Sequence, residues 1–361
     1  MMRILALLAH KSMAKLHNTP GRFPAVIAKR GNMRWIFGVF LSLCACQAST
    51  LPVLRADLGT PRRAADLLAV LDQPGPLTVQ TVASAQWQVD LSGLLDLTDP
   101  RAQAAGLTER AEPITVYFHA IHHPTRGLFL IDTGVETAER DDPPHAKVQG
   151  LVRHFMKSDK LQVTQPLGAW LKAQPDAVAG VLFTHLHIDH IWGVPDLPPT
   201  ALYVGPGEST AREFQHLFVQ GPTDALLAGQ KALRELAFQP DADGRFAGVL
   251  DVFGDGSLWA IWTPGHTPGS VAYIARTPQG PVLFTGDTCH TAWGWQHGVP
   301  PGTFTGDRPL NQDSLDGLRK LAAEHPAMQV RLGHQALEAA ALDVQLPDDG
   351  VVRGAGGKFG R

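Results

Sequence analysis

Residues 183–193 read FTHLHIDHIWG and place three histidines and one aspartate within six positions, directly after an apolar run. Each of these side chains is costly to bury without a partner, so their crowding needs a chemical reason. In an extended backbone, alternate residues face one side, which would direct His185, His187 and Asp189 together and bring His190 from the next turn. Imidazole nitrogens and carboxylate oxygens are ligands that zinc and iron accept. The motif supplies more ligands than one ion needs and indicates two.

Further ligands for two ions follow other apolar runs of the chain. TPGHTPGS places His266 just after one predicted strand, FTGDTCH places Asp287 after another, and RLGHQ places His334 after the last. The segment IDTG contains Asp132 in the corresponding position after an earlier strand. A set of histidines and aspartates at successive strand ends predicts a metal centre at one edge of a sheet.

The pattern of apolar residues predicts strands first, then strands mixed with helices. Expected helices cover 167–175, 209–237 with an interruption at Gly221-Pro222, and 311–326; expected strands cover 77–90, 113–121, 127–134, 177–185, 201–206, 246–253, 257–265, 270–275, 281–287 and 328–334. This order is typical of two packed sheets with helices outside, rather than a purely alternating parallel sheet.

With these motifs in this order, the chain resembles the metallo-β-lactamase superfamily over roughly residues 77–335. The resemblance implies an α+β fold, an αββα sandwich with metals at one edge of its sheets. It implies two Zn²⁺ ions, other divalent metals being possible, and assigns Asp132 to support of the site. The implied ligands are His185, His187 and His266 for one ion, Asp189, His190 and His334 for the other, and Asp287 as the bridge between them.

Such a site predicts a dinuclear metal-dependent hydrolase that attacks an ester with a metal-bridging hydroxide. We expect a lactone or carboxylic ester, with Asp189 relaying a proton to the leaving alkoxide. In acyl-homoserine lactonases of this superfamily, a Tyr often stands three residues after the bridging Asp. Here that position is His290, as in methyl-parathion-hydrolase-like and broad-specificity lactonase branches. We expect His290 to be catalytic and to donate a hydrogen bond to a carbonyl or phosphoryl oxygen; the alternative is a purely structural role.

Other functions remain open at this point. Organophosphate or phosphotriester hydrolysis is the nearest alternative, and a mononuclear-iron oxidoreductase or a metal-binding protein without turnover belongs to a different class. The expected partner is a small-molecule substrate with an apolar group. Trp293, Trp295 and Phe304 in residues 291–304 would form an apolar wall for that group, or merely a packed surface loop.

Composition narrows the class of protein but not the substrate. The chain has 361 residues, of which 44% are hydrophobic and 18% charged, and its formal net charge is −3. That balance gives no basic surface for nucleic acid, so no nucleic-acid partner is expected. The three cysteines, Cys44, Cys46 and Cys289, form no Cys-x-x-Cys metal motif. The oligomeric state cannot be inferred.

The amino-terminal region has the pattern of an export signal. Residues 1–34 hold seven Lys or Arg and no acidic residue, and the apolar run at 35–43 is too short to span a bilayer. LCAC at 43–46 resembles the lipobox of bacterial lipoproteins, which suggests a lipid anchor at Cys46. We expect an exported protein, periplasmic or membrane-anchored. The alternatives are a buried amino-terminal helix, cleavage after Ala48 without lipid, or a cytoplasmic protein.

The predicted domain organisation has four parts. Residues 1–46 are an over-called start plus an export or lipoprotein signal, with Met33 as the expected true start. Residues 47–76 are a linker, 77–345 the metallo-β-lactamase-fold domain, and 346–361 a polar Gly-rich tail.

Overall fold

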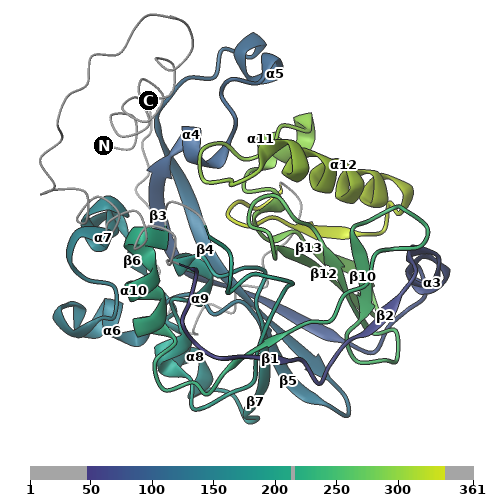
Figure 1. Ribbon diagram of the computed structural model, residues 1–361, viewed down its shortest axis with the longest axis horizontal. Coiled ribbons are helices and arrows are strands. Elements are labelled where there is room, and N and C mark those ends of the chain that lie inside the picture. The colour runs from purple at the N-terminus through teal and green to yellow at the C-terminus, as the bar shows by residue number, and fades with distance from the viewer. Residues whose placement is uncertain (1–46, 213–215, 338–361) are drawn as a thin grey trace, which may run out of the picture. The chain divides into compact units, whose positions relative to one another are not determined.

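The fold is built on two β-sheets. The structure, a computed structural model, describes residues 47–212 and 216–337 (Figure 1). The eight-stranded sheet has the order β1 (Val53–Arg55), β9 (Leu233–Glu235), β8 (Leu202–Val204), β7 (Val178–Leu182), β5 (Gly127–Ile131), β4 (Ala111–His123), β3 (Thr78–Asp90), β6 (Gln162–Val163). The six-stranded sheet has the order β14 (Gln329–Arg331), β13 (Gly280–Phe284), β12 (Val271–Thr277), β11 (Leu258–Trp262), β10 (Gly248–Asp251), β2 (Thr60–Arg62).

The two sheets pack face to face through an apolar core. Ile131 and Leu182 of the eight-stranded sheet meet Leu258 and Tyr273 of the other, all of them nearly or fully buried. Because both faces of each sheet are covered, the central strands are apolar on both sides rather than alternating. All seven residues of β12 are buried, which requires cover on its outer face as well.

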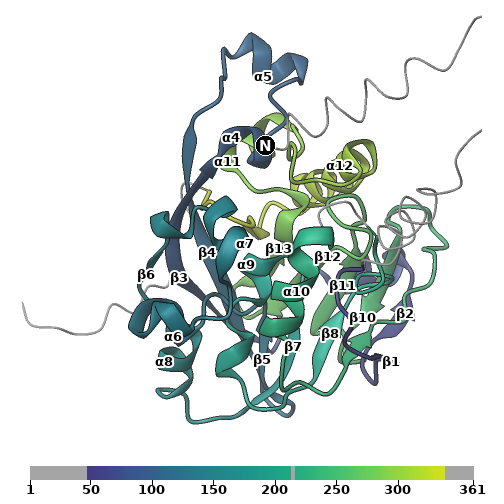
Figure 2. The ribbon, with the colours of Figure 1, turned by 60° about the vertical axis from the view of Figure 1, so that its left-hand side comes forward.

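Helices cover the two outer faces. On the eight-stranded sheet they are α7 (Gly150–Phe155), α8 (Leu167–Leu171), α9 (Ile188–Ile191) and α10 (His216–Leu226), of which α7, α9 and α10 lie side by side (Figure 2). On the six-stranded sheet lie α3 (Ala64–Val70) and α12 (Arg308–Glu324), whose Leu67 and Leu318 belong to the same buried apolar cluster as strands β11 to β14. The expected α+β αββα sandwich is confirmed.

Strand direction places several strand ends at one edge. Strands β5, β7, β8 and β9 run parallel, so their carboxyl ends point the same way. In the other sheet β13 and β14 are parallel to each other. The loops that leave β5, β7, β11, β13 and β14 carry every residue that the sequence motifs single out.

The prediction that residues 47–76 are a linker is wrong. This segment contributes β1, which pairs with β9, and β2, which pairs with β10, so it adds an edge strand to each sheet. Its beginning is also fixed, because Asp224 of α10 accepts hydrogen bonds from the Ser49 hydroxyl at 2.7 Å and the Thr50 amide at 2.9 Å. Three-residue strands are too short to show a period in sequence.

The helical prediction for residues 209–237 is only partly right. A helix is present, but α10 continues through Gly221-Pro222 instead of stopping there, and residues 233–235 form the strand β9. Pairing with both β1 and β8 decides the conformation of β9 against its local helical preference.

The predicted signal, Cys46 and the tail at 346–361 lie outside the described residues. Within the described part of the chain, none of the helices is both long enough and apolar enough to cross a membrane.

Candidate metal centre

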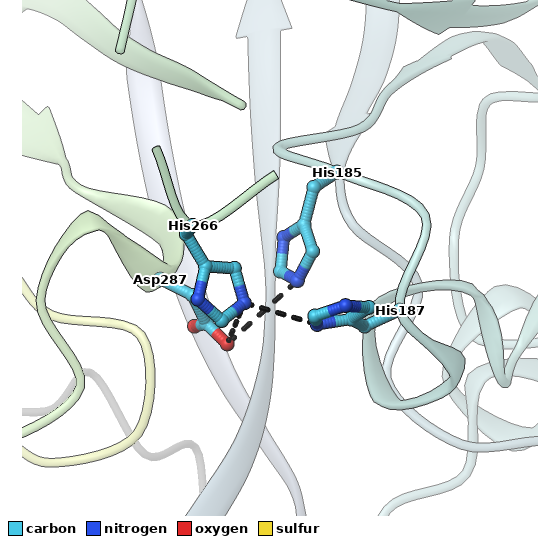
Figure 3. Close-up of side chains that lie close together, drawn as sticks. All are labelled: His185, His187, His266 and Asp287. Atoms are coloured by element: carbon cyan, nitrogen blue, oxygen red, sulfur yellow. Dashed lines mark hydrogen bonds and ion pairs between the residues drawn. The ribbon is translucent and has the colours of Figure 1, made fainter. Parts of the chain in front are cut away.

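The structure brings all seven predicted ligands together at the edge shared by the two sheets. They form two groups, His185–His187–His266–Asp287 and Asp189–His190–Asp287–His334, and the candidate ligand atoms of each group lie within 4.8 Å of one another. Asp287 belongs to both groups. Figure 3 shows the first group, with the three imidazoles converging on the carboxylate.

The opening motif folds as a loop followed by a short helix. His185 and His187 follow β7, and His187 is the residue that precedes α9. Asp189 therefore lies in a helical turn rather than in the extended backbone that the sequence suggested, and His190 lies in the same turn. The change of backbone divides the motif, so that its first two histidines point to one group and its last two ligands to the other.

Distances around Asp287 are consistent with a shared carboxylate. Its Oδ2 atom lies 3.7 Å from His185 Nε2 and 3.5 Å from His266 Nε2. The same oxygen lies 3.3 Å from the Nε2 atoms of both His190 and His334. Between the first-group histidines, His187 Nδ1 and His266 Nε2 are 2.9 Å apart.

The inner histidines are oriented by contacts of their outer nitrogens. His334 Nδ1 donates to the Thr115 carbonyl at 3.1 Å, so its Nε2 atom faces the centre. His190 Nδ1 donates to Asp132 Oδ2 at 2.8 Å, and His266 Nδ1 lies 3.1 Å from Thr305 Oγ1. Such outer partners fix the tautomer and orientation of a metal-binding imidazole.

Asp132 supports the site from the end of β5. Its Oδ1 accepts from the Thr184 amide at 2.8 Å, and its Oδ2 accepts from the Thr184 hydroxyl at 2.9 Å. Asp132 has a positive φ of 57°, an uncommon conformation for a non-glycine residue that turns the chain sharply after the strand. The side chain thus joins β5, β7 and His190, but it is in neither of the two groups.

The electrostatics of the two groups differ. Burial lowers the pKa of His187 to about 4 and holds the pKa of His185 and of His266 well below the usual value. Burial also disfavours the charged form of His334, but Asp287 and Asp189 outweigh it and raise its pKa to about 10. The first group is therefore neutral near pH 7 apart from Asp287, whereas the second attracts positive charge, as protons or a cation.

The chemistry of the buried atoms fits metal ions. Among the described residues, no group hydrogen-bonds to the buried atoms His185 Nε2, His190 Nε2 and Asp287 Oδ1. Leaving such atoms without partners costs on the order of 1–3 kcal/mol each, and more for charged groups. Imidazole nitrogens and carboxylate oxygens directed at one point are satisfied by a divalent cation.

Backbone close to Asp287 is packed without room for side chains. A Cβ added to Gly333 would lie 2.2 Å from Asp287 Oδ1, far inside contact distance. Gly286 has a positive φ of 49°, and a Cβ there would lie 2.7 Å from Thr184 Cβ. Gly333 is therefore required by the close approach of the chain after β14 to the shared carboxylate, and Gly286 by the close approach of the chain after β13 to Thr184.

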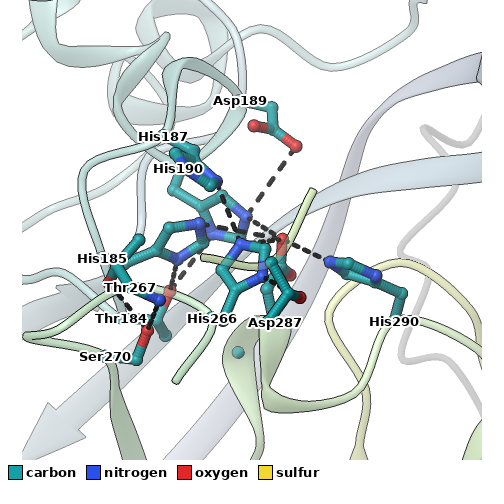
Figure 4. Close-up of polar contacts among 12 residues, drawn as sticks. Thr184, His185, His187, Asp189, His190, His266, Thr267, Ser270, Asp287 and His290 are labelled. Atoms are coloured by element: carbon teal, nitrogen blue, oxygen red, sulfur yellow. Dashed lines mark hydrogen bonds and ion pairs between the residues drawn. The ribbon is translucent and has the colours of Figure 1, made fainter. Parts of the chain in front are cut away.

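His290 lies in the site, beside the shared carboxylate. Its Nε2 is 2.9 Å from Asp287 Oδ2, and its Nδ1 donates to the Leu94 carbonyl at 3.0 Å (Figure 4). Both ring nitrogens therefore contact protein groups, and the side chain is only 1% exposed. This placement directs His290 at the shared carboxylate rather than outward to a bound molecule.

The tryptophans of residues 291–304 do not form the expected wall. Trp293 packs against the buried cluster of Leu91, Leu95 and Val299, and Trp295 packs on the core under α12. Phe304 differs, because it is 38% exposed and precedes Thr305, the residue that contacts His266. For the two tryptophans, the alternative prediction of a packed loop agrees with the structure.

Sequence reasoning missed several residues that support the site. Thr115 and Thr305 contact ligand histidines that lie far away along the chain, so no local pattern indicates them. His216, the first residue of α10, is 5% exposed and close enough for its charge to affect His187. Glu208, in the turn after β8, is 2% exposed and contacts both ligand loops of the first group.

The family description of the metallo-β-lactamase superfamily matches residues 111–334. The chain belongs to the metallo-β-lactamase superfamily. The matched region contains the whole candidate centre, from Thr115 on β4 to His334 after β14. The resemblance inferred from the motifs is thereby confirmed.

Several curated relatives of the chain are named as lactonases or hydrolases. The N-acyl homoserine lactonase AttM of Azorhizobium caulinodans is 31% identical over 229 residues, which cover 61% of this chain and 82% of that protein. The hydroxyacylglutathione hydrolase of Pseudomonas putida is 32% identical over 128 residues, covering 35% of this chain and 40% of that enzyme. The expectation of a metallo-hydrolase enzyme is confirmed at the level of the family.

Solved structures agree on the metallo-β-lactamase fold. A quorum-quenching N-acyl homoserine lactone lactonase superposes with a TM-score of 0.51 at 18% identity, covering 73% of this chain and 93% of its own. A probable metal-dependent hydrolase from Staphylococcus aureus gives 0.51 at 13% identity, covering 73% and 90%. At such identities the likeness establishes the fold alone.

Proposed function

We propose that this protein is a dinuclear metal-dependent hydrolase of lactones or carboxylic esters. The observation that carries the proposal is the membership of Asp287 in both ligand groups, with the buried Asp287 Oδ1 lacking a hydrogen-bond partner among the described residues. A carboxylate shared by two histidine-rich groups suits two neighbouring ions. The relatives with N-acyl homoserine lactonase activity support the choice of a lactone.

The ligand sets match two divalent ions, for which zinc is the first choice. His185, His187 and His266 would hold one, Asp189, His190 and His334 the other, and Asp287 would contact both. Ions in such a site supply Lewis acidity and an acidified water, which serves as the nucleophile near neutral pH.

Asp189 is placed to move a proton. Its side chain is 16% exposed, whereas the Asp287 and His334 side chains are each 4% exposed, so Asp189 lies nearest to solvent among these three. Its Oδ2 lies 3.3 Å from His334 Nε2 and 3.8 Å from His190 Nε2. We assign Asp189 the role of passing a proton to the leaving alkoxide.

His290 holds the shared carboxylate in place. Its two nitrogens connect Asp287 with the Leu94 carbonyl, so the ring fixes the direction of the carboxylate. Replacement of His290 by Ala would lower kcat through displacement of Asp287. If His290 contacted the substrate instead, its replacement would also raise KM.

The substrate class follows from the reaction and from the exposed aromatic ring. Phe304 is half covered and lies two residues from Gly306, whose amide donates to the His266 carbonyl at 3.1 Å. An acyl or aryl group bound there would lie close to the first ligand group. The substrate is therefore an ester or lactone with an apolar portion.

Metal analysis and a substrate panel test the proposal together. Two zinc equivalents per chain, with hydrolysis of lactones or aryl esters that is lost in Asp287→Ala, would support it. Phosphotriesters belong in the same panel, because preference for them would favour the alternative hydrolase. One iron per chain with oxygen uptake, or activity that survives Asp287→Ala, would contradict it.

We also propose that the protein is exported and anchored by lipid at Cys46. The support is the sequence pattern of residues 33–46. Detergent-phase partitioning of the expressed protein tests it, and a Cys46→Ser form that partitions like the parent would contradict the anchor.

A further inference from the structure

Glu208 connects the two loops that carry the first ligand group. It lies in the turn after β8 and is 2% exposed. Its Oε1 accepts a hydrogen bond from the Leu186 amide at 2.7 Å. Its Oε2 accepts from the Thr267 hydroxyl at 2.7 Å and from the Gly269 amide at 3.0 Å. Every one of these contacts lies outside the ligand set itself.

The donors stand next to the metal-binding histidines. Leu186 lies between His185 and His187, so its amide belongs to the peptide that joins two ligands of one group. Thr267 directly follows His266, the third histidine of that group. The first loop leaves the eight-stranded sheet and the second belongs to the six-stranded sheet, so Glu208 joins loops of different sheets.

The packing around this carboxylate leaves it little freedom. A Cβ added to Gly269 would lie 2.5 Å from Glu208 Cβ, and one added to Gly205 would lie 1.9 Å from the Gly269 carbonyl. Ser270 Oγ lies 2.8 Å from Thr267 Oγ1 and accepts from the Thr267 amide at 3.0 Å. Thr267 and Ser270 appear together below His185 in Figure 4.

We propose that Glu208 is the positioning residue for the first metal ion, by fixing the distance between the His185–His187 loop and the His266 loop. Asp132 supports the second group by contacting His190, and it also reaches His185 of the first group through Thr184, whose Oγ1 lies 3.2 Å from His185 Nδ1. This inference rests on the proposed two-ion function.

A carboxylate suits this position because all three contacts are donated to it. A glutamine has nearly the same shape, but its NH₂ group cannot accept a hydrogen bond. Glu208→Gln therefore leaves at least one donor of either the Leu186 loop or the His266 loop facing another donor. The substitution changes the hydrogen-bond pattern and preserves the volume.

The test is a zinc competition titration of the zinc-loaded protein with a chromophoric chelator. In Glu208→Gln we expect the dissociation constant of one of the two ions to rise by roughly 10- to 100-fold, the range for loss of an outer-shell partner, while that of the other stays unchanged. Glu235→Gln is the matched control. Glu235 lies on β9, and its Oε2 accepts from the amide of Gly207, the neighbour of Glu208, at 2.8 Å, so it contacts the same turn but neither ligand loop.

Cobalt substitution identifies which ion is weakened. The absorption spectrum of half-loaded Glu208→Gln should match that of His187→Ala and should differ from that of His190→Ala. A Glu208→Gln spectrum that matches His190→Ala would overturn the assignment of Glu208 to the first ion. Thr267→Val removes one of the three hydrogen-bond donors to Glu208 and should also weaken binding of the first ion alone, with a smaller rise in its dissociation constant. This variant replaces Glu208→Gln in the test if Glu208→Gln does not fold.

The remaining outcomes separate the two proposals. If the parent holds fewer than two ions, the proposed function itself is contradicted. If the parent holds two and Glu208→Gln keeps both with parental affinity, only the role of Glu208 is contradicted. Equal weakening of both ions with a lower Tm of the zinc-free protein would show a general structural role and would also overturn the inference.

Discussion

At the residue scale, the shared carboxylate depends on a neighbour without a side chain. Gly333 adjoins His334, and its missing Cβ leaves room for Asp287 Oδ1. We predict that Gly333→Ala displaces Asp287 and weakens both ions, by roughly 10- to 100-fold in affinity. Zinc titration with kcat measurement checks this.

Gly317→Ala on α12 is the control for that change. A Cβ at Gly317 would meet the Phe246 ring at an ordinary 3.6 Å, so this substitution should leave metal binding and kcat unchanged. It should raise stability slightly, because alanine is favoured over glycine in a helix by about 1 kcal/mol. A Gly333→Ala protein with parental zinc affinity would contradict the role of Gly333.

A second residue-scale prediction concerns pH and stability. Burial raises the pKa of Glu136 to about 7, and its Oε1 accepts from the Lys147 amide at 2.7 Å. The folded protein therefore binds this proton more tightly than the unfolded chain, whose glutamates titrate near 4.3. The stability that this proton contributes is complete below about pH 4 and is lost as pH rises through 7.

Glu136→Gln removes that titration, so the fall in Tm between pH 5 and pH 8 should be smaller than in the parent. Glu109→Gln, at an exposed position, should keep the parental difference. Thermal unfolding at the two pH values measures this difference in Tm. An equal fall in Tm between pH 5 and pH 8 for all three proteins would refute the prediction.

The ligands could be read from the sequence because their motifs are short and follow strands that are themselves apolar. The partners that orient them could not, because Thr115 and Thr305 meet His334 and His266 only through the tertiary fold. His290 shows the same limit: its position in the motif was evident, but its contact with Leu94 depends on α4 (Leu91–Leu94), which is distant in sequence.

At the element scale, the segment before Leu77 decides whether the sheets have covered edges. Strands β1 and β2 pair with β9 and β10, and Thr50 contacts Asp224. We predict that a chain beginning at Leu77 is insoluble or unfolded, because it exposes the edges of β9 and β10. A chain beginning at Gln47 should fold.

Solubility, circular dichroism and thermal unfolding of the two chains give the comparison. Folding of the chain that begins at Leu77, with parental Tm, would restore the interpretation of residues 47–76 as a linker.

The longer elements were predictable because their periodicity extends over many residues, as in β3 and α12. Short elements were not, because the three residues of β1, β2 or β9 carry no period. Their conformations come from pairing partners that lie far away along the chain, as between Leu54 and Arg234. Local sequence therefore determines the centre of each sheet better than its edges.

At the scale of the whole molecule, each ligand group contains residues from both sheets. His185 and His190 follow β7 of one sheet, whereas His266, Asp287 and His334 follow strands of the other. Bound ions would therefore hold the sheets together at this edge. The sandwich was predictable from the order of strands and helices, but this division of ligands between sheets required the topology.

We predict that removal of the metals lowers the thermal stability of the whole domain. An ion at a thousand times its dissociation constant contributes about 4 kcal/mol, which corresponds to a Tm change of roughly 10 °C in a domain of this size. Thermal unfolding with zinc and with excess chelator measures it. Asp287→Ala should show little difference between the two conditions, and an unchanged parental Tm would contradict the prediction.

The position of His334 after β14 has a consequence for how the protein matures. Among the seven ligands it is the last to leave the ribosome, and β14 can pair with β13 only once that part of the chain is available. A nascent chain that has made His185 to His190 therefore still lacks the complete second group. Metal loading would be a late event in biogenesis, and a chain truncated by premature termination before β14 would be released without a working centre.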